Sequence, residues 1–197
     1  MAKSCAPSPP QTLAEYLRAF ERLNVNRAGG MASPHKPCML LATLDLAEAG
    51  KLVQNQIRFE PPLLERYARF FNIVRGPGDR PNPWLPFFHL RGDGFWHLQP
   101  KPGHEAALEV LDSARSASVI EESIACASLD PVLHSLVLDP TAREELRQQL
   151  VVAWFGAFSQ PLNAVFEEER RIDDAEIDLR QRIEGKQTTP VEASSVR

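Results

Sequence analysis

The chain has 197 residues, of which 43% are hydrophobic and 24% are charged, a composition typical of one globular domain with its own core. No stretch approaches the roughly 18 uninterrupted apolar residues of a membrane span. The N-terminus also lacks the apolar segment of a secretory signal, so we expect a cytoplasmic protein with no membrane contact. The three cysteines are far apart in the sequence and form neither a disulfide framework nor a zinc-binding pattern.

The net charge of −4 argues against a wholly basic nucleic-acid binder, but the charge is unevenly distributed. Residues 1–100 contain 12 Lys and Arg against 8 Asp and Glu, which gives +4. Residues 101–197 contain 10 against 18, which gives −8. A modestly basic N-terminal half is compatible with a surface that faces phosphate, although charge alone does not decide this.

The first part of the chain predicts three helices joined by polar loops. Thr12 and Glu15 form a capping-box pattern ahead of an amphipathic helix. A second helix should begin near Pro37 and end at Gly50, and its apolar residues occupy most of its circumference, so we expect it to be central and buried. A third, amphipathic helix is predicted over residues 61–74.

A β-hairpin is predicted after an exposed loop that spans residues 75–84. Phe87–Arg91 would pair with Phe95–Gln99 around a turn that contains two glycines. Since an isolated hairpin is not stable in water, it should lie against the helices. In such a hairpin Phe87 and Phe88 point to opposite faces, so that one belongs to the core and the other is exposed.

From residue 104 onward the pattern is helical again, with one helix within residues 130–140 and a longer one that Asp139 caps. The fold class we predict is mainly α with a small β-hairpin (α+β), built as a single compact helical domain. The expected organisation is a flexible arm at residues 1–11, the compact domain at 12–160, a charged helical extension at 161–185, and a linker or disordered tail at 186–197.

The five histidines do not form a recognisable catalytic or metal-binding pattern. No two of them are four residues apart with a carboxylate between them, and no cysteine joins them. We interpret His97 and His134 as structural, and His104 as a helix-cap or surface residue. Nucleophile motifs, phosphate-binding glycine loops and paired catalytic carboxylates are also absent. We therefore expect no catalytic residues, no metal ligands and no cofactor.

Two short stretches are harder to explain by packing alone, and the first lies at the start of the predicted buried helix. It consists of Ser33, Pro34, His35 and Lys36. Free backbone N–H groups and the positive end of the helix dipole attract anions at such a place, and Lys36 adds a full charge. A structural helix start and a phosphate-facing site both remain open for this stretch.

The second stretch lies at the start of the predicted hairpin. Leu85 and Pro86 offer a rigid apolar surface there. The residues near them in the sequence that supply positive charge or hydrogen-bond donors are Arg75, Arg80, His89 and Arg91. Simple packing of a hairpin on the helices is the alternative explanation.

These two stretches carry a resemblance to a known family. The first continues as SPHKPCMLLATLDLAEAGKL, and the second continues as PFFHLRGDGFWHLQPKPG. In this order and spacing they resemble the N-terminal domain of HNH-type modification-dependent restriction endonucleases, a family that includes sulfur-binding domains for phosphorothioated DNA. The resemblance extends from about Leu13 to Phe155.

The resemblance implies a mostly helical domain that docks on double-stranded DNA and takes the phosphorothioate sulfur into a shallow apolar cup. Carried over position by position, the cup is formed by Leu85 and Pro86, with His89 close by and the Ser33–Lys36 corner opposite. Sulfur is larger and less strongly hydrated than oxygen, so an apolar cup favours it, while cationic groups balance the phosphate charge.

We therefore predict a recognition module for phosphorothioated double-stranded DNA in a modification-dependent restriction system. We expect no catalysis from this chain, because nothing after Phe155 resembles an HNH nuclease, and a nuclease domain in a longer protein is a possible partner. The alternatives are a helical protein-interaction or scaffold domain and a domain that recognises a different DNA modification. The predicted DNA-binding residues are Ser33, Pro34, His35, Lys36, Arg75, Arg80, Leu85, Pro86, His89 and Arg91.

Overall fold

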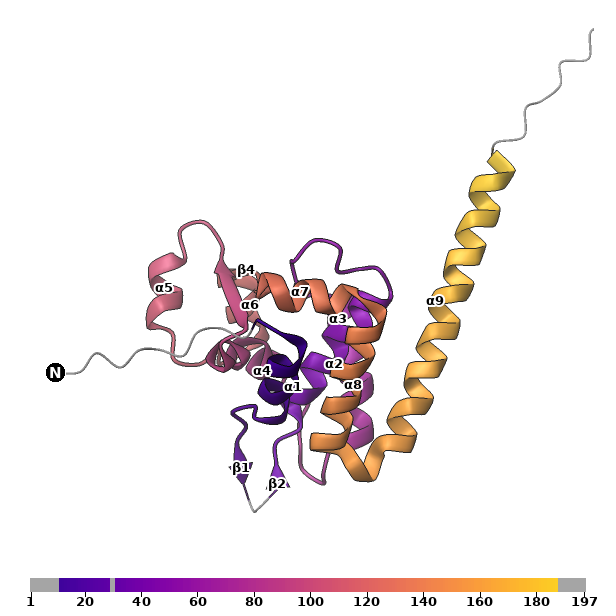
Figure 1. The fold of residues 1–197 in the computed structure, drawn as a ribbon. Coiled ribbons are helices and arrows are strands. Elements are labelled where there is room, and N and C mark those ends of the chain that lie inside the picture. The colour runs from indigo at the N-terminus through magenta and orange to yellow at the C-terminus, as the bar shows by residue number, and fades with distance from the viewer. Residues whose placement is uncertain (1–10, 29–30, 188–197) are drawn as a thin grey trace, which may run out of the picture.

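Helices form most of the chain, and a computed structural model describes residues 11–28 and 31–187 (Figure 1). The helices are α1 (Leu13–Glu21), α2 (His35–Glu48), α3 (Pro61–Val74), α4 (Trp84–His89), α5 (Glu105–Val110), α6 (Ala117–Ser123), α7 (Pro131–Leu138), α8 (Pro140–Phe155) and α9 (Ser159–Gln187), with short 3-10 helices η1 (Leu90–Asp93) and η2 (Gly156–Phe158). The strands are β1 (Arg27–Ala28), β2 (Met31–Ala32), β3 (Trp96–Pro100) and β4 (Ile124–Leu129).

Helix α2 forms the centre of the core, as its apolar sequence predicts. Every residue from Lys36 to Ala47 is buried, and α3, α4, α7 and α8 all pack against this helix. Its burial on all sides removes apolar surface from water, which is the main driving force for folding. The helix begins at His35, with Pro34 at the N-cap, slightly earlier than the predicted start at Pro37.

Side-chain caps that the sequence predicts set the starts of two other helices, α1 and α8. Thr12 and Glu15 form the predicted capping box at α1, in which the Thr12 hydroxyl accepts from the Glu15 backbone N–H. The Asp139 carboxylate accepts from the Ala142 N–H at the start of α8, so the predicted N-cap is also confirmed.

The hairpin predicted for Phe87–Arg91 and Phe95–Gln99 is wrong. The first of these segments belongs to α4 and η1, and Phe87 and Phe88 are both fully buried instead of pointing to opposite faces. Strand β3 pairs antiparallel with β4, which lies in a stretch that the sequence pattern assigned to helices. A short apolar run that is buried on all sides fits a helix or a strand equally well, and periodicity cannot separate the two.

The fold class is nevertheless the predicted one, mainly α with a small β component. Two separate two-stranded antiparallel sheets, β1–β2 and β3–β4, accompany the helices. The β1–β2 hairpin projects from the body below α1 (Figure 1). The arm predicted for residues 1–11 and the tail predicted for 186–197 lie almost entirely outside the described residues.

Helix α9 contains the charged segment predicted at residues 161–185 and contacts the body near its start. Leu162 and Phe166 are buried, and Arg170 forms ion pairs with Glu48 of α2 and Glu144 of α8. Beyond these contacts the helix extends away from the body (Figure 1). The start of α9 packs against α3 and α8, on the side of the body away from α5 (Figure 1).

Candidate nucleic-acid interface

A cavity of 690 Å³ collects most of the predicted site residues. It is lined by eight of the ten, namely Ser33, His35, Lys36, Arg80, Leu85, Pro86, His89 and Arg91. Pro34 and Arg75 are not among its lining residues. The lining residues that sequence analysis did not single out are Asn24, Val25, Asn26, Gly78, Asp79, Asn82 and Gly92.

His35 ties the start of α2 to the loop that carries the two arginines. Its Nε2 lies 2.9 Å from the Arg80 backbone oxygen, and its Nδ1 lies 2.7 Å from the Ser33 hydroxyl. A carbonyl only accepts, so Nε2 donates to Arg80, and in the neutral ring Nδ1 accepts from Ser33. The imidazole also packs on the Phe71 ring, at 4.7 Å between centroids. His35 therefore holds the loop in place, and both of its ring nitrogens are already bonded.

Lys36 is a paired charge rather than a free cation. Its Nζ lies 2.6 Å from Oδ2 of Asp93, and the two side chains are only 11% and 5% exposed. The other carboxylate oxygen of Asp93 accepts from the Asn24 backbone N–H at 2.7 Å. Asp93 thus joins the start of α2, the end of η1 and the segment that leads into β1. The Asp93 carboxylate balances most of the positive charge of Lys36. The sequence predicts that this charge faces a phosphate.

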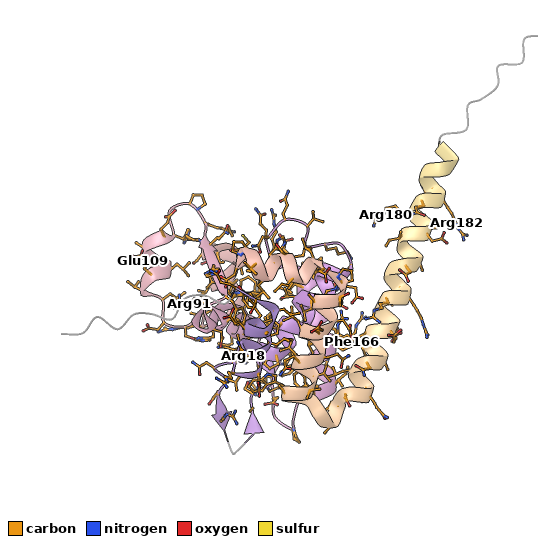
Figure 2. The ribbon with its side chains drawn as sticks, in the orientation of Figure 1. Arg18, Arg91, Glu109, Phe166, Arg180 and Arg182 are labelled. Carbon is orange, nitrogen blue, oxygen red and sulfur yellow. The ribbon has the colours of Figure 1, made fainter. Side chains whose placement is uncertain are left out.

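Arg91 is also held by the protein, but its charge is not balanced in the same way. The guanidinium donates to the backbone oxygens of Leu108 and Leu111 and lies 4.0 Å above the centre of the Phe88 ring. Figure 2 shows Arg91 on the side of the body nearest α5. Carbonyl groups carry no net charge, so Arg91, which lines the cavity, keeps its positive field there.

His89 lies near these two cations and is partly buried. Its Nε2 is 3.1 Å from the Ser113 hydroxyl. Burial lowers the pKa of the His89 imidazole, and the nearby positive charges of Lys36 and Arg91 lower it further. His89 is therefore neutral near pH 7 and contributes hydrogen bonding rather than charge.

Leu85 and Pro86 form the apolar side of the cavity. Pro86 is buried and Leu85 is partly exposed, and both belong to the first turns of α4, behind which Phe87 and Phe88 are completely buried. The Leu85 N–H donates to the Asn82 backbone oxygen, which fixes the start of this helix. Rigid apolar groups backed by a packed core cannot move aside to admit water.

The arginine side chains of the loop before α4 remain at the surface. Arg80 is exposed at the cavity, and Arg75 is exposed at the beginning of the same loop. Their backbone is positioned by the His35 bond to Arg80 and by the bond from the Gly76 N–H to the Asp79 carboxylate. These two exposed arginines thus supply the positive charge that can reach a ligand outside the cavity.

Two of the remaining three histidines, which we interpreted as structural, bond to other parts of the protein, and the third lies at a helix start, as predicted. His97 contacts the Asp130 carboxylate at 2.6 Å, and His134 contacts the Leu52 backbone oxygen at 3.0 Å. His104 occupies the N-cap of α5, but its side chain makes no capping bond. Across residues 11–28 and 31–187, no group of three or more His, Cys, Asp or Glu side chains is placed to hold a metal ion. Within the same residues, no helix is long and apolar enough to cross a membrane.

The cavity is lined by apolar groups as well as by cationic ones, a combination that can hold an anionic group beside apolar carbon. Residues 13–165 match the family described as "ScoMcrA-like, DNA sulfur-binding domain", and the chain belongs to this family. The solved structure titled "Sulfur binding domain of SprMcrA complexed with phosphorothioated DNA" has the same fold. Its TM-score is 0.58 at 18% identity, and the match covers 83% of this chain and 96% of that chain. No curated protein matches the sequence.

Sequence reasoning missed Asp93 and the three asparagines at the cavity. Asp93 lies in a Gly-Asp-Gly sequence that was interpreted as a hairpin turn, and its partner Lys36 is 57 residues away. The asparagines lie in polar loops, where this residue type is common for conformational reasons alone. No local pattern in the sequence distinguishes these residues from ordinary turn residues.

The low pKa of His89 predicts a specific pH dependence of folding stability. The unfolded chain takes up a proton on His89 near its ordinary pKa of 6.5, whereas the folded protein does so only at lower pH. Lowering the pH below about 6.5 should therefore destabilise the fold, until the pH falls below the folded-state pKa. His89→Gln should remove this part of the pH dependence, as urea unfolding across the range measures. The same pH dependence in both proteins would contradict the assignment.

The ion pair between Lys36 and Asp93 predicts an asymmetric effect of substitution. Asp93→Asn leaves the buried Lys36 charge unbalanced and should destabilise the fold by about 3 kcal/mol, and adding Lys36→Met should recover much of this loss. Glu60→Ala, which removes the partner of Arg58 in an exposed ion pair, is the matched control and should cost less than about 1 kcal/mol. Urea unfolding measures all four proteins. An Asp93→Asn effect no larger than the control would contradict a buried pair.

Proposed function

We propose that this chain recognises phosphorothioated double-stranded DNA and is the recognition module of a modification-dependent restriction system. The observation that carries this proposal is the cavity that Leu85 and Pro86 line together with Arg80 and Arg91, in a chain of the DNA sulfur-binding family. The solved neighbour, by its title, was determined in complex with phosphorothioated DNA.

The chemistry of the cavity favours sulfur over oxygen at one position of the phosphate. A phosphate oxygen is strongly hydrated and loses its water at a high cost when it meets apolar carbon. Sulfur is larger, more polarisable and less strongly hydrated, so contact with Leu85 and Pro86 is favourable. The discrimination therefore comes from the penalty on oxygen as well as from the contact with sulfur.

The cationic groups have two different roles in this proposal. Arg80 and Arg75, which are exposed, would contact the phosphates that flank the modified one. Arg91, which uncharged carbonyl groups hold, would supply a fixed positive field at the cavity, whereas Lys36, balanced by Asp93, would keep the start of α2 in place. Ser33, Pro34 and His35 position the loop and the helix start, and the neutral His89 provides a hydrogen bond.

We further propose that this chain does not cut DNA itself. The family domain that residues 13–165 match is a DNA-binding domain, and cleavage would belong to a separate nuclease domain. The binding unit would correspond to residues 12–160, and residues 161–185 would form a charged helical extension. In the proposed restriction system, one domain would recognise the modified DNA and a separate domain would cleave it.

The experiment that tests the proposal compares three versions of one duplex, two phosphorothioate stereoisomers and the unmodified DNA. We expect tighter binding of one stereoisomer, because only one of the two non-bridging positions can face Leu85 and Pro86. Leu85→Asn should abolish this preference and leave weak, salt-dependent binding, since the polar amide hydrates the cavity. Gel-shift titrations measure all combinations. Equal affinity of the wild-type protein for the three duplexes would refute recognition of sulfur.

Removal of the exposed arginine at the cavity should change the salt dependence of DNA binding. Arg80→Ala should weaken binding of modified and plain DNA to a similar extent and reduce the slope of log K against log salt by about 1, since a phosphate contact carries no modification signal. Arg171→Ala, an exposed arginine on α9, is the control and should leave the slope unchanged. An unchanged slope for Arg80→Ala would exclude this contact. A slope near zero in the wild type would favour a protein-interaction domain instead.

A further inference from the structure

The outer part of helix α9 carries large apolar side chains that the body of the domain does not cover. Ile172, Leu179 and Ile183 are 43%, 59% and 52% exposed. The main contacts of α9 are with α3, α8 and η2, and beyond them the helix extends away from the body (Figure 1). Several large aliphatic groups that are exposed on one element are more informative than a single exposed leucine, because they can form a patch.

These three side chains lie in one row along the helix. Successive residues of an α-helix are about 100° apart around its axis, so intervals of seven and four residues place Ile172, Leu179 and Ile183 within roughly 40° of one another. Val165, seven residues before Ile172, lies in the same row and is partly buried against the core. We call Ile172, Leu179 and Ile183 the α9 stripe.

The body of the domain holds a different side of the same helix. Leu162 and Phe166 are buried, and Arg170 forms ion pairs with Glu48 and Glu144. The three residues of α9 that make these contacts follow one another at intervals of four, and their side lies about a third of a turn from the α9 stripe. Figure 2 shows Phe166 at the part of α9 that lies beside the body. The stripe is therefore a second face of the helix, separate from its contact with the body.

A helix that packs against nothing is only marginally stable in water. Most of the stability of helices in proteins comes from packing of an apolar face, and isolated helices shorter than about 12–15 residues are marginal even with favourable sequences. On the outer part of α9, Arg182 pairs with Asp178 at 2.7 Å, but both side chains are more than half exposed, so the pair adds little. A second helix against the α9 stripe would supply the packing.

The charges along this part of α9 match those of a second copy in antiparallel orientation. In the sequence, residues 173–178 include four acidic residues and no basic one, whereas residues 180–186 include three basic residues and one acidic. A parallel pair would place like charges side by side. An antiparallel pair places the acidic segment of each helix beside the basic segment of the other, with Leu179 near the centre. Charges beside an apolar seam set the orientation of paired helices in this way.

We infer that this chain forms a dimer in which the α9 stripes of two copies pack against each other in antiparallel orientation. This inference goes beyond the proposed function and does not depend on DNA binding. The two bodies lie at opposite ends of the helix pair, and each keeps its own contacts with Leu162 and Phe166. The dimer thus presents two copies of the cavity, and DNA with two suitably spaced modified phosphates would gain affinity from the linkage.

The first test measures the mass of the protein in solution by sedimentation velocity over a range of concentrations. We expect a monomer–dimer equilibrium. Ile172→Lys combined with Leu179→Lys should weaken dimerisation by about tenfold or more, because it brings charges into an apolar seam. Val53→Lys is the matched control, since Val53 is an aliphatic residue outside α9 that is 72% exposed, and it should have no effect.

Two results of this test would overturn the inference. One is a wild-type protein that stays monomeric at every concentration. The other is a dimer that the double lysine variant retains, because that dimer would use another surface. Circular dichroism and thermal unfolding of each variant confirm that the body is folded.

The second test uses single cysteines to determine the orientation, in a Cys5→Ser background. In the antiparallel pair residue 172 of one copy lies near residue 183 of the other, so a mixture of Ile172→Cys and Ile183→Cys should form disulfide-linked dimers on oxidation. Either variant alone should link poorly, because the two copies of one position would be about 16 Å apart, too far for a disulfide. Efficient linking of each variant with itself would show a parallel pair and overturn the antiparallel arrangement.

Discussion

The buried ion pair between Lys36 and Asp93 is the constraint on which the geometry of the cavity depends. Its carboxylate binds the Lys36 ammonium through one oxygen and the Asn24 backbone through the other. It thereby connects the start of the central helix α2 with η1 and with the segment before the β1–β2 hairpin. A buried charge pair is stable only with good geometry, so these three segments cannot shift independently. This one carboxylate therefore holds together three segments that contribute lining residues to the cavity.

A second connection, the hydrogen bond between His35 and the Arg80 backbone, positions another part of the cavity lining. His35 binds the Arg80 backbone and thus attaches the arginine-containing loop to α2, while Leu85 and Pro86 begin α4 directly after that loop. The Pro34 and Pro37 that bracket His35 and Lys36 restrict the backbone at the helix start. The polar side chains at this start are therefore positioning groups, and the exposed arginines are the groups left to meet a ligand.

Features that depend on neighbouring residues were predictable from the sequence, and those that depend on distant contacts were not. The central helix, the capping box at Thr12 and the cap at Asp139 are local patterns, and the structure has all three. The segment around Phe87 and Phe88 was assigned to a hairpin because burial on all sides hides its helical period. Eight predicted site residues do meet at one cavity, but the pairing of Lys36 with Asp93 arises only when the chain folds.

The most direct test of the account is a crystal structure of this chain with a stereopure phosphorothioate duplex, in which the anomalous signal of the sulfur gives its position. The account predicts that the sulfur lies in van der Waals contact with Leu85 and Pro86, with the Lys36–Asp93 pair intact beside it. A sulfur atom that points to solvent, or a duplex bound on another face of the domain with the cavity empty, would contradict it.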